Sequence, residues 1–269
     1  MIPFMIISVL FSAEETFNPF AGPIPMLVFI QTNPWSMVIG SGTPRVAIYH
    51  TGEAIFVKTV HGKPVYHQVM LDKADLAKVR ERMVPVLTLT DIQSSYNIAP
   101  YVTDQPEAMF YLNDGQRQVA TTVYGLKESR IKSQLDATSQ NAPEFRMPPE
   151  QLWTLHEWLC TLDFPLSREW TPPYVEVMLW DFSNSTGPLI QWPEGWPTLD
   201  SDRTITHGNV YSIFLDGGLL PEVQKFFASR LSHGAVELAG KKWAASYRHT
   251  FPREPEWRKA FAKASSIGN

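Results

Sequence analysis

Apolar and polar residues alternate in three short runs in the first half of the chain, over 45–50, 53–60 and 65–71. The runs are rich in β-branched and aromatic residues, and polar turns that contain glycine separate them. Such residues with a period of two are typical of half-buried strands joined by tight turns. The pattern predicts an antiparallel meander.

The lengths of the two turns set the predicted register of this meander. Compact turns at 50–53 and 61–64 would place Arg45 opposite Lys58, and Lys58 opposite His67, in one basic row. Like charges opposite one another destabilise a sheet by up to about 1 kcal/mol, so the row suggests an anionic partner. A solvent face on which the long side chains splay apart is the alternative. The opposite face would then carry the core residues Val46, Ile48, Ile55, Val57 and Met70, beside Tyr66.

A helix is predicted directly after the meander. Asp72 suits the N-cap position, and Asp75 stands three positions later, in an arrangement similar to a capping box. Leu76, Val79 and Met83 then recur at helical spacing. We expect this helix to cover the apolar face of the meander.

Similar patterns predict the remaining elements. An Asn-Asp-Gly step at 113–115 lies between two strand-like runs and is a strong hairpin signal. Prolines at 148–149 and at 221 favour the start of two helices. The other expected elements are strands over 174–180, 210–215, 235–239 and 243–247 and a last helix over 255–264. The predicted fold class is α+β, with antiparallel meander and hairpin sheets and a few covering helices.

A polar stretch over 127–149 shows no sustained periodicity, as is typical of a linker or a long surface connection. It predicts a division into two α+β halves of similar size, 14–126 and 150–269. Eight of the nine tryptophans lie from Trp153 onward, so the second half is the one rich in tryptophan and proline.

The N-terminal residues 1–13 allow two interpretations. An apolar run over 2–11 is followed by Ser12, Ala13 and two glutamates, which is typical of a signal peptide. No lysine or arginine precedes the run, and a buried first strand is the alternative. We favour export to a periplasmic or extracellular location slightly over a cytoplasmic one. The next apolar stretch, 24–40, is interrupted by polar residues, so no transmembrane span is expected.

Composition and motifs exclude several classes of function. The 23 basic and 27 acidic residues give a net charge of −4, which offers no field to attract nucleic acid. The single cysteine, Cys160, excludes an intramolecular disulfide and a zinc site built from several cysteines. The chain has no P-loop, no dinucleotide-binding fingerprint and no nucleophile elbow. We therefore expect no nucleic-acid partner, no cofactor and no metal.

Two Trp-Pro steps lie four residues apart, at Trp192 and Trp196. Proline forces each preceding residue into an extended conformation, so a stiff loop holds both indoles. Rigid aromatic side chains on a loop suit recognition of a protein, an apolar ligand or a sugar. The alternative, which we favour, is that both rings cover the core of the second half, because tryptophan buries a large area.

These features predict a non-catalytic binding protein whose contact surface is the Trp-Pro loop or the basic row. Its partner would be a protein or a small ligand, which the residues do not identify further. The alternative is a hydrolase, in which a metal would assist, with an Asp/His site in the second half. Its candidate residues are Asp181, Asp200, Asp202 and His207.

Overall fold

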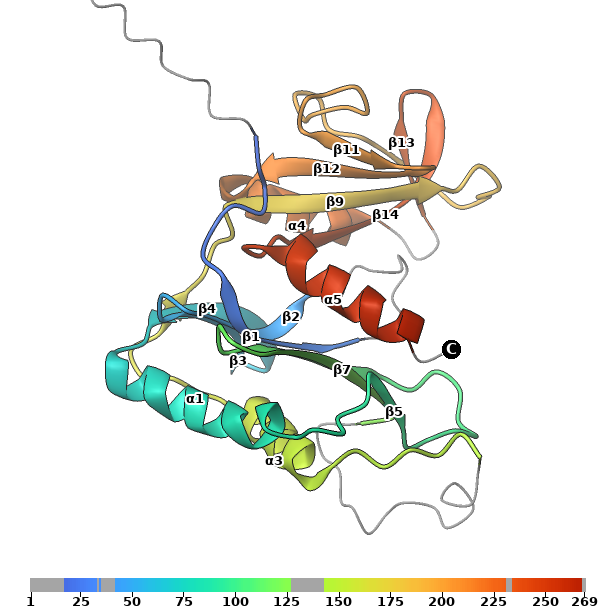
Figure 1. Cartoon of the computed structure of the whole chain (residues 1–269). Coiled ribbons are helices and arrows are strands. Elements are labelled where there is room, and N and C mark those ends of the chain that lie inside the picture. Colours follow the sequence, from blue (N-terminus) through green and yellow to red (C-terminus); the bar gives the residue numbers. More distant parts are fainter. Residues whose placement is uncertain (1–16, 33, 35–41, 127–142, 231–233, 268–269) are drawn as a thin grey trace, which may run out of the picture.

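The computed structural model describes residues 17–32, 34, 42–126, 143–230 and 234–267. It confirms the α+β fold class, with two sheets in which most neighbouring strands are antiparallel (Figure 1). The proposed signal peptide or first strand over 1–13 and most of the polar connection lie outside the described residues. Within the described part of the chain, no helix is long and apolar enough to span a bilayer.

The first sheet has eight strands in the order β5-β7-β6-β1-β2-β3-β4-β8. All neighbours are antiparallel except β5 and β7, which are parallel. The central strand β1 was not predicted from the sequence. The strands are β1 (Pro25–Gln31), β2 (Pro44–Tyr49), β3 (Glu53–Val60), β4 (Lys63–Met70), β5 (Ser95–Asn97), β6 (Glu107–Asn113), β7 (Gln118–Tyr124) and β8 (Arg168–Glu169).

The second sheet has six strands in the order β10-β13-β14-β9-β12-β11. Only β10 and β13 are parallel neighbours. The strands are β9 (Tyr174–Asp181), β10 (Leu189–Gln191), β11 (Thr204–His207), β12 (Val210–Asp216), β13 (Ala235–Leu238) and β14 (Lys241–His249).

Helices cover both faces of the first sheet. The helices α1 (Lys73–Leu87) and α3 (Glu150–Cys160) pack together on one face, and α5 (Glu254–Ile267) lies between the two sheets (Figure 1). A fourth helix, α4 (Leu220–Ser229), packs on the second sheet after a short 3-10 turn, η2 (Gly217–Leu219). The first sheet thus takes α3, β8 and α5 from the part of the chain that follows the polar connection.

The predicted N-terminus of α1 is confirmed. Asp72 is the N-cap, and its carboxylate accepts a hydrogen bond from the backbone N–H of Asp75 at 2.8 Å. Val79 and Met83 are buried against the first sheet, where the helical spacing placed them.

The turn between β3 and β4 is shorter than predicted. His61 and Gly62 both have positive φ, 49° and 76°, which is the sign that a two-residue type I′ hairpin turn requires. Lys58 consequently pairs with Val65, and the predicted pairing of Lys58 with His67 is wrong.

The register between β2 and β3 differs from the prediction by one residue. Val46 pairs with Phe56, so Arg45 does not lie opposite Lys58 and the basic row does not form. A shift of one residue moves every side chain of a strand to the other face. Ala54 and Phe56 therefore join Val46 and Ile48 in the core beneath α1, whereas the predicted core residues Ile55 and Val57 face the other side and Met70 is exposed.

Candidate functional site

A cleft of about 980 Å³ lies between the first sheet and the second. The strands β2, β3, β4 and β8 form its floor, while α4 and the end of β14 form the opposite wall. Clefts at the junction of two structural units are common ligand sites. The side chains used below are Arg45, Lys63, Tyr66, Glu169, Trp170, Arg248 and His249, all of which line the cleft.

Three aromatic rings form one wall of the cleft. His249 at the end of β14 stacks on Trp170 at 5.9 Å between ring centroids and lies 4.7 Å from the ring of Tyr66. Phe251 packs behind Trp170 at 4.9 Å and is fully buried. Because its neighbours fix each ring, the wall is preformed; its rings are inclined to one another, by 51° between Tyr66 and His249 and by 70° between Tyr66 and Trp170.

The hydroxyl group of Tyr66 is held in place and stays neutral. It donates to the backbone carbonyl of Pro44 at 2.8 Å and lies 2.6 Å from the hydroxyl of Thr43. Burial raises the pKa of Tyr66 to about 12, so the phenol carries no charge at neutral pH. Tyr66 therefore contributes a ring and a fixed hydroxyl group, and no anionic base.

His249 is also neutral at physiological pH. Burial lowers its pKa from 6.5 to about 4. A second histidine, His156 on α3, shows the same shift to about 4, also caused mainly by burial, and its ring packs against Phe29 and Phe110 in the core of the first sheet. Both imidazoles therefore act as aromatic packing groups at neutral pH.

We expect the free energy of unfolding to fall as the pH is lowered from 6.5 to 4. In this range the unfolded chain binds a proton at His156, whereas the native imidazole stays neutral down to about pH 4. The expected loss is about 1.4 kcal/mol per pH unit for one such histidine. Urea unfolding at several pH values measures the slope. His156→Gln should reduce the slope by the contribution of one histidine, because His249 keeps its own, and His207→Gln, at an exposed position, should not reduce it; equal slopes for both variants would contradict the assignment.

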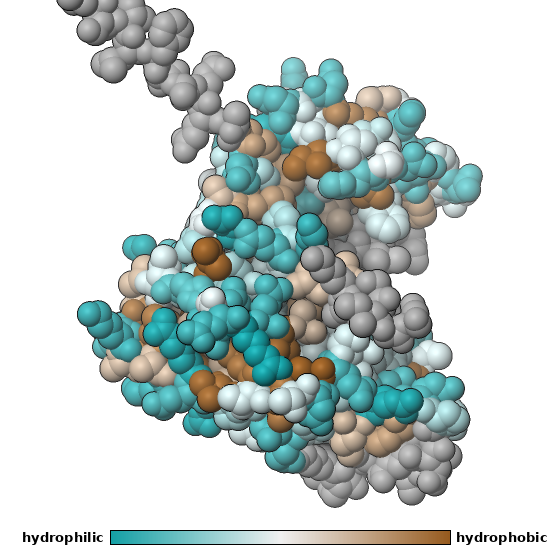
Figure 2. Space-filling model, in the orientation of Figure 1, coloured by the Kyte–Doolittle hydropathy of each residue, from teal (hydrophilic) through white to brown (hydrophobic). Residues whose placement is uncertain are grey.

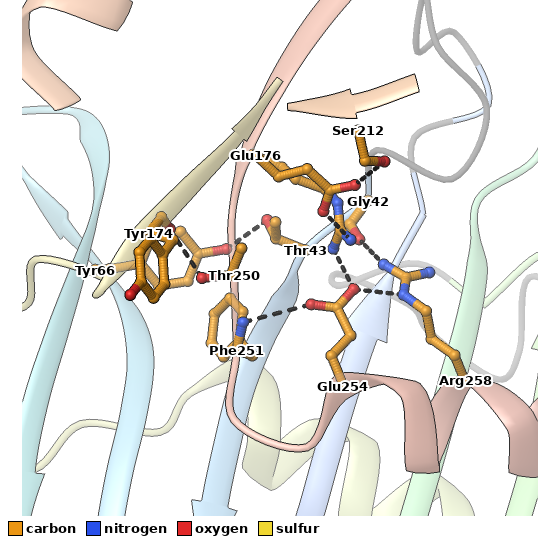
Figure 3. Close-up of polar contacts among 11 residues, drawn as sticks. Gly42, Thr43, Tyr66, Tyr174, Glu176, Ser212, Thr250, Phe251, Glu254 and Arg258 are labelled. Atoms are coloured by element: carbon orange, nitrogen blue, oxygen red, sulfur yellow. Dashed lines mark hydrogen bonds and ion pairs between the residues drawn. The ribbon is translucent and has the colours of Figure 1, made fainter. Parts of the chain in front are cut away.

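A buried ionic network joins the second sheet to α5 beside the cleft (Figure 3). The guanidinium group of Arg248 on β14 forms ion pairs with Glu176 on β9 and with Glu254 at the start of α5. All three side chains are at most 6% exposed. Ser212 on β12 donates its hydroxyl to Glu176 at 2.6 Å. Arg258, one turn along α5, pairs with Glu254.

The network keeps Arg248 charged and fixes the cleft wall. Burial alone would lower the pKa of Arg248, but the carboxylates of Glu254 and Glu176 raise it overall. Arg258 also donates to the carbonyl of Gly42 at 3.0 Å, which ties α5 to the segment leading into β2. The position of one sheet relative to the other is therefore set by directional, charge-assisted contacts.

Basic residues outnumber acidic ones around the cleft. The charged lining residues are Arg45, Lys63, Arg248 and Glu169. The two glutamates of the network pair with Arg248. Arg45 stands at an irregularity of the β1–β2 ladder, where Val46 and Pro44 pair with neighbouring residues of β1. Three of the four charged residues that line the cleft are therefore basic.

The structure separates the residues of the predicted basic row. Arg45 lines the cleft. Lys58 forms an ion pair with Asp163 at 2.8 Å, and His67 contacts the hydroxyl of Ser167 at 3.2 Å. Lys58 and His67 share the face of the first sheet that carries Phe56, away from the cleft.

The two tryptophans of the Trp-Pro loop lie on the second sheet. Their rings meet edge to face at 5.2 Å, and both contact Phe226 of α4. Both are half-buried against the core of that sheet, and the Trp192 indole donates to the carbonyl of Pro197 at 3.1 Å. This arrangement favours the interpretation that the loop covers the core. A contact role for the loop stays a prediction.

The four residues of the alternative hydrolase site are exposed. Asp181 accepts hydrogen bonds from Ser183, and Asp200 accepts one from Thr198, as is typical of turns. Within the residues that the structure describes, no three His, Cys, Asp or Glu side chains come together in a way that could hold a metal ion. Asp181, Asp200, Asp202 and His207 therefore form no metal site.

The fold and the cleft define an α+β protein with a preformed site between two sheets. No protein-family model, curated protein or solved structure shows a significant similarity to the chain. Its function is therefore inferred from the geometry of the site.

Proposed function

We propose that the protein binds a small anionic ligand with a flat ring in the cleft between the two sheets, without catalysing a reaction. The observation that carries the proposal is the lining of the cleft: a fixed aromatic wall of Tyr66, Trp170 and His249 beside Arg45 and Lys63. A ring of the ligand would pack on the wall, and its carboxylate or phosphate group would meet the cations.

The energetics of the two contacts are complementary. Packing between aromatic rings contributes about 0.5–1.5 kcal/mol beyond the area it buries. A hydrogen bond to a charged group contributes roughly 1.5–3 kcal/mol, and less where the group is exposed, as Lys63 is. The rigid wall lowers the ordering cost of binding. These terms together suit a ligand of modest affinity that needs both a ring and a negative charge.

Matched probes test the proposal by isothermal titration calorimetry. We expect 2-naphthoate to bind with one-to-one stoichiometry and 2-naphthamide, which has the same rings and no charge, to bind more weakly. Lys63→Gln and Arg45→Gln should each weaken naphthoate binding about fivefold, which corresponds to roughly 1 kcal/mol. Neither substitution should change the affinity for naphthamide.

Lys58→Gln is the matched control, because Lys58 is not among the residues that line the cleft and pairs with Asp163. Its affinity for naphthoate should equal that of the unmodified protein. Equal affinities of the two probes, or a loss of naphthoate binding in Lys58→Gln alone, would refute an anion site in the cleft.

A further inference from the structure

A second surface lies at the β8 edge of the first sheet, away from the cleft. A groove of about 510 Å³ runs between the end of β4, the start of α1 and the segment that leads into β8. We call it the edge groove; its lining residues include Glu53, Met70, Asp72, Asp75, Leu166 and Arg168.

Two large apolar side chains at this groove are exposed to an unusual degree. Leu166 is 98% exposed and Met70 is 66% exposed. On the face shown in Figure 2, hydrophilic side chains cover most of the surface and hydrophobic residues show in small separate groups. Two exposed apolar side chains that line one groove therefore indicate a surface that a partner covers.

The backbone at the same place is open to a further strand. The edge strand β8 pairs with β4 only at His67 and Gln68, and the ladder ends before Met70. Leu166, in the segment that leads into β8, has a φ of 61°, in the left-handed region. An extended segment could therefore lie along the uncovered end of β4.

The charged residues of the edge groove are mostly acidic. Three carboxylates, Glu53, Asp72 and Asp75, face one cation, Arg168. Asp72 caps α1 and Asp75 pairs with Lys78. Glu53 is half-buried, and no cation pairs with its carboxylate within the described part of the chain. Burial raises the pKa of Glu53, as expected of a carboxylate without a charge partner.

We propose that the edge groove binds an extended segment of a partner protein in which a leucine-like side chain and a lysine or arginine stand two positions apart, because Met70 and Glu53 pair across β4 and β3 and share one face of the sheet. The apolar side chains would cover Met70 and Leu166, and a basic side chain would pair with Glu53. The proposal concerns a macromolecular partner on another surface, so it is independent of the ligand in the cleft.

Labelled synthetic peptides test it by fluorescence anisotropy. The probe is a fluorescein-labelled heptapeptide in which leucine and lysine alternate at the odd-numbered positions with threonine between them, so that both side-chain types share one face; one control peptide has glutamate in place of lysine, and another has serine in place of leucine. We expect the Lys-Leu peptide to bind and both control peptides to bind at least about tenfold more weakly. Equal binding of all three peptides would overturn the proposal.

Two variants of the protein place the binding at the groove. Leu166→Asn introduces a residue that tolerates positive φ, and Glu53→Gln removes the negative charge. Each variant should bind the Lys-Leu peptide about fivefold more weakly than the unmodified protein does. Leu189→Asn and Glu222→Gln, at exposed positions on the second sheet and α4, are the matched controls and should bind normally. Unchanged binding in both groove variants would overturn the proposal. The proposal would also be overturned if the protein associates with itself and Leu166→Asn abolishes this self-association, because a second copy of the chain would then occupy the groove.

Discussion

Replacing Arg248 with methionine should destabilise the protein by about 3–5 kcal/mol, the usual cost of removing one partner from a buried ion pair. The substitution leaves Glu176 and Glu254 buried without the cation that neutralises both. Glu254 keeps Arg258, whereas among the residues that the structure describes Glu176 keeps only the hydroxyl of Ser212. Urea unfolding at neutral pH measures the change in the free energy of unfolding.

Arg203→Met is the control for this experiment. Arg203 forms an ion pair with Asp216 at 2.7 Å, and their side chains are 36% and 64% exposed, far more than those of the buried network. An exposed pair contributes about 0–1 kcal/mol, so this variant should remain nearly as stable as the original. If Arg248→Met costs less than Arg203→Met, the buried network does not hold the second sheet to α5.

Trp257→Ala should destabilise the protein by about 3–5 kcal/mol, as is typical when a large buried aromatic side chain is truncated. Trp257 on α5 is fully buried in the core on the cleft side of the first sheet, with Phe251 and Tyr49. The guanidinium group of Arg258 lies 4.9 Å from the centre of its ring. Truncation leaves a cavity and loosens the helix that carries Glu254.

Tyr101→Ala is a matched control, because the ring of Tyr101 is 60% exposed. The same unfolding measurement should show a change within about 0.5 kcal/mol for this variant. Equal losses of unfolding free energy in Trp257→Ala and Tyr101→Ala would show that the packing of α5 on the first sheet does not stabilise the protein.

The sequence predicted those elements whose pattern is local. The cap of α1 at Asp72, the hairpin at 113–115 and the helix that follows Pro149 are each specified by a few neighbouring residues, and the structure contains all three. Strand β1 was missed for the opposite reason. Its successive side chains point to opposite faces of the sheet, and both faces are covered, one by α1 and α3 and the other by α5. Apolar residues therefore occupy both sets of positions, and the strand shows no alternation of apolar and polar residues.

The pairing register of β2, β3 and β4 could be predicted only if the lengths of the turns between these strands were predicted correctly. His61 adopts positive φ, which is uncommon for residues other than glycine, so the two-residue turn before β4 was not recognised. That error, with the one-residue shift at β2, accounts for the basic row that the structure does not contain.

The cleft was not predictable from local pattern, because distant segments supply its wall. Tyr66, Trp170 and His249 come from β4, from the segment after β8 and from β14. One local signal was available for the network beside it: Glu176 interrupts β9, which is otherwise largely apolar, and a charge at such a position needs a buried partner.

The indole N–H resonances of the tryptophans give the most direct test of where a ligand binds. In a ¹H–¹⁵N correlation spectrum, the Trp170→Phe variant assigns Trp170, and corresponding variants assign Trp192 and Trp196. On titration with 2-naphthoate we expect the Trp170 resonance to shift in a saturable way, while those of Trp192 and Trp196 stay in place. A shift at Trp192 or Trp196 with Trp170 unmoved would contradict a site in the cleft and place binding on the Trp-Pro loop instead.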